Sequence, residues 1–371
     1  MHNSHKDQTR AARSSICGFI FAFLLMMSPS PVQLSASSVD SAASDLEDRP
    51  WAARWIGPAD GPSNDYGVYL FRKTIEWDGE GQSLPIRVSA DNRYRLYVNG
   101  LELGVGPARG DYLHWRYDTY DLSEYLKQGQ NRILVKVWNF GQYRPWAQLT
   151  RETALIVEGG AGLRSNGSWQ VVRIPAYSPL PLDMETLNTF LVAGHGVRID
   201  GAAMPWGWEQ GDHPDLEWAP ARVMGYGFPH GVGTDGNWLL VPNELPPMEQ
   251  KTQRFASVRR SIGIDAPKSW LSGDEALTIE PSKTVRILVD NRVLTTAYPR
   301  LTVSGGRGAS IRLTYAEALY DQPVGGIKGN RDVVEGKFIR GVVDEFLPDG
   351  SSQRLFTPLR FRTFRYVQLE I

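Results

Sequence analysis

Short apolar runs alternate with turn-forming residues over nearly the whole chain. A first block of such runs covers residues 68–77, 84–91, 94–100, 132–141, 153–159 and 168–175. A second block covers residues 284–291, 299–305, 310–319, 342–348 and 359–371. Short runs rich in β-branched and aromatic residues, bounded by Gly, Pro, Asn and Asp, are typical of β-sandwich strands. The pattern therefore predicts an all-β protein with two β-sandwich, jelly-roll-like domains in tandem.

One short helix is expected between these strands. Asp121 is followed three positions later by Glu124, and the segment reaches Gly129. This spacing resembles the capping box that starts many helices. No longer helical pattern is visible in the chain.

The sandwiches are expected at residues 51–240 and 253–371. Residues 241–252 contain three prolines and little periodicity, so we expect a linker between the two domains. A second polar linker is expected at residues 44–50.

The N-terminus has the pattern of a targeting segment. Basic residues precede an apolar run at residues 16–27, and the small residues Ser41 and Ala43 follow. This order is typical of a signal peptide, and the run is too short to span a bilayer comfortably. We therefore expect residues 1–43 to be a cleaved signal peptide with its cleavage region. The mature protein is then secreted or periplasmic, with no stable membrane span.

Cysteine usage and charge narrow the function further. Cys17 is the only cysteine and lies within the expected signal peptide, so disulfides, a cysteine nucleophile and Cys-based zinc sites are excluded for the mature chain. The formal net charge of −1 gives no basic excess for binding nucleic acid. The 12 Trp residues suit either core packing or aromatic platforms for sugars.

The segment SADNRYRLYVNG at residues 89–100 raises a question of chemistry. Its second half alternates as a half-buried strand does, but it begins with Asp91 and Asn92, which are poor strand formers. A turn capped by its own side chains is one interpretation. The other is a calcium site, since calcium takes six to eight oxygen ligands and Asn139 could contribute from a nearby loop. Spacing alone favours the turn.

Acidic residues and histidines offer alternative chemistry. Glycoside hydrolysis needs two carboxylates about 5–10 Å apart. Glu317 lies in an apolar strand, and Glu209 lies in an acidic loop at 209–218. Solvated or strand-end carboxylates are the simpler interpretation of both. The four histidines outside the signal peptide show no metal-binding spacing.

The order of motifs along the chain resembles a known family. Residues 96–141 resemble the N-terminal β-sandwich of bacterial α-L-rhamnosidases, with a strand ending in V-N-G, a G-x-G-P loop, a Tyr-Asp-Leu turn and G-x-N before a long apolar strand. Residues 289–319, the K-G-N-R loop at 328–331 and residues 355–370 are similar to the second sandwich of the same enzymes. The resemblance covers residues 51–371.

The resemblance implies a binding site. Some members of this family use the first sandwich as a calcium-dependent rhamnose-binding module. Arg144 and Trp146 are expected as further sugar contacts, without a matching family motif. The implied metal ligands are Asp91, Asn92, Asn139 and the carbonyl of Pro145, and the implied sugar-binding residues are Asp91, Asn92, Trp115 and Asn139.

The resemblance also implies a function without catalysis. In these enzymes an (α/α)₆ barrel carries the catalytic acids and follows the F-R-Y-V strand, whereas this chain ends there. We therefore expect an exported carbohydrate-binding part of an α-L-rhamnosidase-like protein that binds terminal L-rhamnose of plant or bacterial polysaccharides, with calcium as cofactor. Its expected partners are rhamnose-containing glycans and a catalytic domain. The alternatives are scaffold sandwiches that support such a catalytic domain, or an intact glycoside hydrolase.

Overall fold

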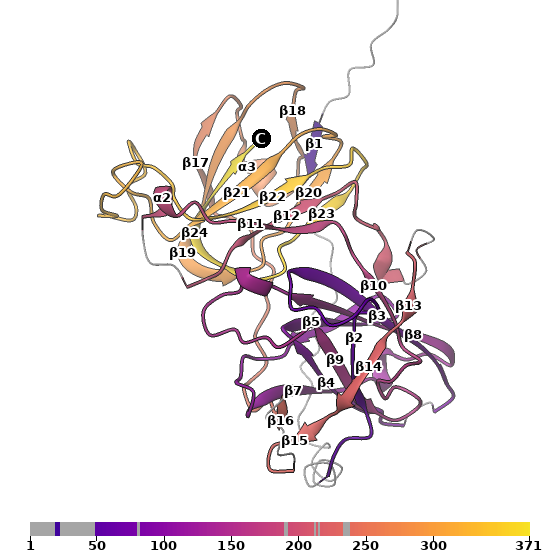
Figure 1. The fold of residues 1–371 in the computed structure, drawn as a ribbon. Coiled ribbons are helices and arrows are strands. Elements are labelled where there is room, and N and C mark those ends of the chain that lie inside the picture. The colour runs from indigo at the N-terminus through magenta and orange to yellow at the C-terminus, as the bar shows by residue number, and fades with distance from the viewer. Residues whose placement is uncertain are drawn as a thin grey trace, which may run out of the picture.

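The structure is a computed structural model that describes residues 19–22 and 49–371, except 80–81, 189–191, 211–212, 214–215 and 233–237. It is nearly all β, with 44% strand and 6% helix, which confirms the predicted fold class. Figure 1 shows two strand-rich blocks, one above the other, with the C-terminus in the upper block.

The first sandwich consists of two sheets. Its six-stranded sheet has the order β13 (Ala219–Pro220), β10 (Gln170–Arg173), β3 (Gly67–Trp77), β8 (Gly129–Asn139), β5 (Arg93–Val98) and β6 (Leu101–Gly106). Its seven-stranded sheet has the order β14 (Arg222–Tyr226), β2 (Arg54–Gly57), β9 (Ala154–Gly159), β4 (Pro85–Asp91), β7 (Trp115–Asp121), β16 (Leu239–Pro242) and β15 (Phe228–Pro229).

The second sandwich also has two sheets. The larger has the order β11 (Tyr177–Leu180), β12 (Gly196–Asp200), β22 (Val342–Leu347), β21 (Ile311–Ala316), β24 (Arg362–Glu370), β19 (Arg286–Ala297) and β17 (Ser257–Ile262). The smaller has the order β18 (Leu277–Ile279), β1 (Phe19–Ala22), β20 (Leu301–Ser304) and β23 (Arg354–Phe356). The helical elements of the described residues are short: η2 (Ser123–Tyr125), η3 (Gly141–Tyr143), α2 (Met184–Leu187), η4 (Trp208–Gln210) and α3 (Lys268–Ser272).

The chain crosses between the sandwiches within the range 51–240 expected for the first one. β12 pairs in parallel with β22, and β11 pairs with β12, so both strands belong to the second sandwich. The later strands β13 to β16 return to the first sandwich.

The six-stranded sheet is buried on both of its faces. Along β3, Tyr69 and Phe71 join the core between the two sheets of the first sandwich, whereas Val68 and Leu70 join a second core. That second core continues into the second sandwich. This arrangement explains why β3 begins with the unbroken apolar run from Val68 to Phe71, as strands covered on both faces do.

A buried charge lies at this junction of the sandwiches. Lys136 of β8 points to the same face as Leu134, and its ammonium lies 4.9 Å from the ring centroid of Trp208. Burial lowers the pKa of this ammonium to about 8.

The prediction of a short helix after Asp121 is wrong in the type and length of the helix. The segment forms only the 3₁₀ turn η2, and its N-cap has no side-chain hydrogen bond. Asp121 Oδ1 instead accepts hydrogen bonds from the backbone N–H groups of Leu84 and Ser123, which ties the turn to the start of β4. Gly129 already begins β8, so the segment is too short for more helical turns.

One strand falls in the expected signal peptide. β1 pairs antiparallel with β18 and with β20. The rest of the expected signal peptide, and most of the linker at 44–50, lie outside the described residues. In the described part of the chain, no helix is long and apolar enough to cross a membrane.

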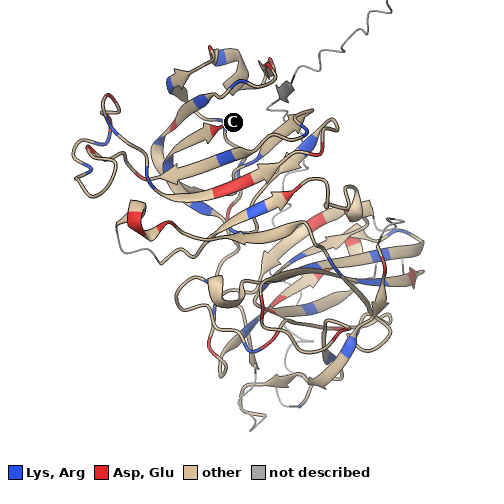
Figure 2. Cartoon of the chain, turned by 45° about the horizontal axis from the view of Figure 1, so that its top comes forward, with Lys and Arg blue, Asp and Glu red and all other residues tan. Residues whose placement is uncertain are grey.

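Charged side chains of both signs are interspersed along the strands and loops of both sandwiches (Figure 2). This mixture agrees with the near-neutral net charge.

Candidate functional site

Asp91 ends β4, and its side chain is fully buried. Oδ1 accepts a hydrogen bond from Asn92 Nδ2 at 2.7 Å, and Oδ2 accepts from the backbone N–H of Arg151 at 2.8 Å and from Trp238 Nε1 at 3.1 Å. Burial raises the pKa of the carboxyl to about 6, although these hydrogen bonds act in the opposite direction.

Asn92 and Asn139 fasten the loop that follows β8. Asn92 Oδ1 accepts from the backbone N–H of Phe140 at 2.8 Å. Asn139 Oδ1 accepts from the backbone N–H of Gly141 at 2.8 Å, and its Nδ2 donates to Thr150 Oγ1 at 2.8 Å. Both amide side chains are fully buried.

The structure therefore brings the three predicted oxygen ligands together, but in a closed arrangement. Each side-chain oxygen of Asp91, Asn92 and Asn139 accepts a hydrogen bond from a donor of the chain. Calcium needs open oxygens at about 2.3–2.6 Å, so a bound ion would have to displace these donors. In this arrangement donors of the chain occupy the oxygens that would bind calcium. The described residues also contain no group of three or more His, Cys, Asp or Glu that could hold a metal ion.

The other predicted site residues surround the same loop with different exposure. Trp115 is only 3% exposed and stacks on Tyr112, with ring centroids 6.1 Å apart. The carbonyl of Pro145 accepts a hydrogen bond from the backbone N–H of Gln148 at 3.1 Å. Trp146 is 65% exposed. Of these three residues, only Trp146 presents its side chain to solvent.

Arg144, the remaining predicted residue, is exposed and folds back onto its own loop. Its Nη1 donates to the carbonyl of Gly141 at 3.0 Å. The guanidinium therefore ties Arg144 to the start of the 3₁₀ turn η3.

The two candidate catalytic acids, Glu209 and Glu317, have different surroundings. Glu209 of η4 lies near Lys136, and burial raises the pKa of its carboxyl. Glu317 is ion-paired with Lys328 at 3.4 Å. The two carboxylates have different partners, and this arrangement gives no acid–base pair between them.

Two histidines that are distant in sequence meet at the surface. The rings of His114 and His230 stack with centroids 4.8 Å apart, and His114 Nδ1 lies 3.1 Å from Asp111 Oδ1. His230 Nδ1 lies 2.8 Å from the carbonyl oxygen of Leu113. We therefore interpret the contact between the two rings as packing at the protein surface. Sequence spacing gave no sign of this pair. His114 directly precedes β7 and His230 directly follows β15, and these strands come close only in the folded sheet, where β16 lies between them.

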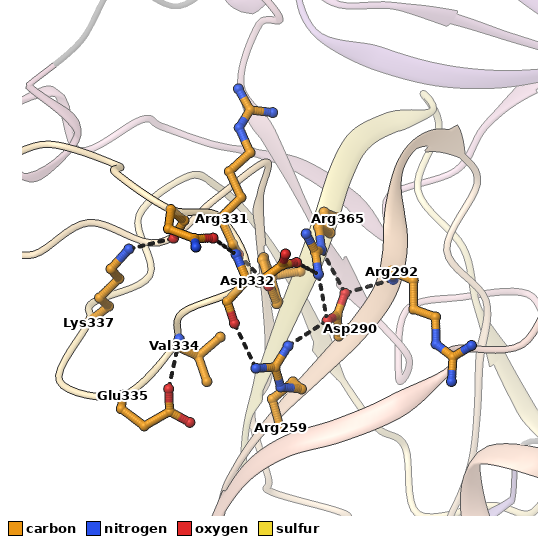
Figure 3. Close-up of polar contacts among 11 residues, drawn as sticks. Arg259, Asp290, Arg292, Arg331, Asp332, Val334, Glu335, Lys337 and Arg365 are labelled. Atoms are coloured by element: carbon orange, nitrogen blue, oxygen red, sulfur yellow. Dashed lines mark hydrogen bonds and ion pairs between the residues drawn. The ribbon is translucent and has the colours of Figure 1, made fainter.

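A charged cluster in the second sandwich holds the loop with the K-G-N-R motif (Figure 3). Asp290 of β19 accepts hydrogen bonds from Arg259 Nη1 at 2.9 Å and from Arg365 Nε at 3.0 Å. Arg365 also pairs with Asp332 at 2.6 Å, and Arg259 Nη2 donates to the Asp332 carbonyl at 2.8 Å. Because each charge has a partner, we interpret this cluster as structural.

A small cavity near the predicted site was missed by the sequence analysis. Residues of both sandwiches line it, among them Arg93, Arg109, Trp138 and Arg360. Arg93 lies two positions after Asp91, but Arg360 lies near the end of the chain, so no local pattern links them.

Comparison with solved structures shows where this fold occurs. A GH78 family rhamnosidase of Bacillus sp. GL1 matches 87% of this chain and 53% of its own, with 14% identity and a TM-score of 0.66. The α-L-rhamnosidase of Aspergillus terreus matches 86% of this chain and 34% of its own, with 18% identity and a TM-score of 0.57. The enzyme of Streptomyces avermitilis, solved in complex with L-rhamnose, matches 82% of this chain and 27% of its own, with 17% identity and a TM-score of 0.51.

Sequence comparisons add no further assignment. No family model matches the chain. No curated protein matches it. The chain spans about half the length of the Bacillus enzyme and about a third or less of the other two. The chain therefore shares its fold with part of each of these enzymes.

Proposed function

We propose that the chain is a non-catalytic β-sandwich region of an α-L-rhamnosidase-like protein, and that it binds rhamnose-containing glycans outside the cytoplasm. The observation that carries the proposal is the extent of the likeness to the Bacillus rhamnosidase, which covers 87% of the chain and therefore includes both sandwiches. The protein would be exported by the expected signal peptide and would hold a linked catalytic unit close to its polymer. A weak contact suffices for this role, because tethering raises the effective concentration of the sugar.

The surface proposed for the sugar is the loop at 141–150. Trp146 is 65% exposed there, and Arg144 of the same loop is also exposed. An aromatic ring can cover the apolar face of a pyranose, and a guanidinium can donate hydrogen bonds to its hydroxyls.

Calcium-assisted binding is the more specific form of this proposal. It requires Asp91, Asn92 and Asn139 to exchange their present donors for the ion, with the carbonyl of Pro145 as a further ligand. Because the pKa of Asp91 is raised to about 6, the carboxylate becomes available only as the pH rises above that value. One carboxylate among neutral ligands implies weak binding, with a Kd on the order of 10⁻⁴–10⁻³ M.

Calorimetric titration with L-rhamnose tests both forms. The chain is titrated in calcium chloride and again in excess EGTA, alongside Trp146→Ala, Asp91→Ala and the control Leu245→Ala, which removes an exposed apolar side chain in the expected linker. The proposal expects heat from the wild type and from Leu245→Ala but not from Trp146→Ala. Binding that persists unchanged in EGTA and in Asp91→Ala would reject the calcium form alone.

A scaffold role is the second candidate, and a specific observation favours it. The outer face of β3 and β8 shares one continuous apolar core with the second sandwich. The oxygens of Asp91 are also engaged by the chain itself. A rigid unit of this kind could support a catalytic domain without binding a ligand. Absence of L-rhamnose binding under all conditions would favour the scaffold, and release of rhamnose from an aryl rhamnoside by the purified chain would favour an intact hydrolase.

A further inference from the structure

A cavity of about 20 Å³ lies where the two sandwiches meet. The first sandwich contributes Arg93, Arg109 and Trp138 to its wall. The second contributes Tyr298, Arg360 and Phe361. Three guanidinium groups therefore surround one space, and no acidic side chain lines it.

Arg93 is influenced by a nearby acid but is not bonded to it. Its side chain makes no hydrogen bond or ion pair within the described part of the chain. The acid whose charge acts on it is Asp118. That carboxylate already accepts hydrogen bonds from Tyr94 Oη at 2.6 Å and from Asn243 Nδ2 at 2.6 Å.

The other two arginines bind only neutral groups. Arg109 Nη1 donates to the carbonyl of Trp146 at 3.1 Å, and Arg360 Nη1 donates to the carbonyl of Ala193. Burial, reinforced by the nearby charges of Arg109 and Arg93 among others, lowers the pKa of the Arg360 guanidinium to about 10. The cavity wall thus brings three positive charges close together and contains no acidic side chain of its own.

An unused donor lies in the same wall. The ring of Trp138 is 1% exposed, and its Nε1 has no hydrogen-bond partner among the described residues. Buried N–H groups are rarely left without an acceptor. A ligand with an anionic oxygen in the cavity would accept hydrogen bonds from the guanidinium groups and would bring an acceptor to the wall that contains Trp138.

We propose that this cavity binds the carboxylate of an acidic saccharide. Its volume of about 20 Å³ is too small for a sugar ring, so the ring would remain at the mouth and only the charged group would enter. The rings of Tyr298 and Phe361, whose centroids are 6.2 Å apart, offer an aromatic wall for the adjoining sugar ring. Charge-assisted bonds from guanidinium groups are the strong type of hydrogen bond to a carboxylate. The inference goes beyond the proposed function, which concerns a neutral sugar at the loop 141–150.

Calorimetry at fixed ionic strength tests the site with three compounds: sodium D-glucuronate, D-glucose and sodium acetate. Fixed ionic strength is needed because salt screens exposed charges. The variants are Arg360→Gln and Arg109→Gln, with Arg307→Gln as the control, since Arg307 is exposed and outside the cavity wall. Thermal unfolding confirms that each variant is folded. Arg109 is itself exposed, so its variant remains informative if Arg360→Gln does not fold.

We expect glucuronate to bind and glucose to give no heat. Acetate should bind at least about tenfold more weakly, because it lacks the sugar ring. Each cavity variant should weaken glucuronate binding at least about tenfold, as the loss of a charge-assisted hydrogen bond does. Equal affinity for acetate and glucuronate, an equal loss in Arg307→Gln, or no glucuronate binding would overturn the proposal. L-rhamnose binding that persists without glucuronate binding would overturn this inference and leave the proposed function standing.

Discussion

The carboxylate of Asp91 accepts a hydrogen bond from the indole Nε1 of Trp238, 3.1 Å away across 147 positions of sequence. Trp238 directly precedes β16, so the bond joins the end of β4 to a strand that returns late in the chain. The residue expected to bind an ion therefore also holds the first sandwich together. Both roles depend on the same two oxygens.

The buried carboxyl of Asp91 predicts a pH dependence of stability. Its pKa is about 6 in the folded chain and 3.8 for an ordinary aspartate in an unfolded one. Between these values the folded state binds more protons, so the stability that this group contributes is fully present below about pH 4 and is lost as the pH rises through 6. The difference of about two pKa units corresponds to about 3 kcal/mol.

Urea denaturation of the wild type and of Asp91→Asn at pH 4 and pH 7.5 checks this prediction. Asn does not titrate at position 91. The pH dependence of all other groups is shared by the two proteins and therefore cancels in the difference between their free energies of unfolding. The destabilisation caused by Asp91→Asn should be smaller at pH 7.5 than at pH 4 by about 3 kcal/mol. A destabilisation that is equal at the two pH values would contradict it.

The buried ion pair between Asp344 and Arg362 predicts a large loss of stability. Asp344 accepts from Arg362 Nε at 2.9 Å and from the backbone N–H of Val197 in β12 at 2.8 Å. Asp344→Ala leaves the guanidinium buried without a counter-charge, which costs about 3–5 kcal/mol. The double variant with Arg362→Met should recover part of this loss in chemical denaturation.

The exposed pair of Glu249 and Lys251 supplies the control for this measurement. Glu249→Ala should change the free energy of unfolding by less than about 0.5 kcal/mol. Equal effects of Asp344→Ala and Glu249→Ala would show that burial does not set the cost.

The cluster around Asp290 predicts local protection against proteolysis (Figure 3). Asp290→Ala should leave Arg259 and Arg365 without their shared carboxylate and loosen their contacts with Asp332. Tryptic cleavage after Arg331 should then accelerate, on the order of tenfold for each 1.4 kcal/mol of local stability lost. Gel or mass-spectrometric time courses measure the rate. Asp265→Ala, at an exposed position, should cleave as the wild type does, and an unchanged rate in Asp290→Ala would refute the assignment.

The strands of this fold could be predicted from local pattern, because alternation and turn residues act over a few positions. β8 was expected at residues 132–141 and spans Gly129–Asn139. The entry of β11 and β12 into the second sandwich could not be predicted from local pattern. It depends on Asp344 and on pairing with β22, both far along the chain. The helix prediction after Asp121 failed for the same reason. The Asp121 side chain accepts a hydrogen bond from the backbone N–H of Leu84, which lies outside the local pattern.

The candidate site was predictable in its residue types but not in its accessibility. Asp91, Asn92 and Asn139 do converge around one loop. What the sequence could not reveal is that donors from Arg151 and Trp238 already engage the carboxylate. The cavity of Arg93, Arg109 and Arg360 was beyond local analysis as well, because the two sandwiches create it by packing together.

The central claim, glycan binding at the loop 141–150, is tested most directly by saturation-transfer NMR with L-rhamnose. The method suits an affinity near 1 mM, which corresponds to about −4 kcal/mol. The account predicts transfer to L-rhamnose but not to D-glucose, and loss of that transfer in Trp146→Ala but not in Leu245→Ala. No transfer to L-rhamnose from the wild-type chain, with and without calcium, would contradict it.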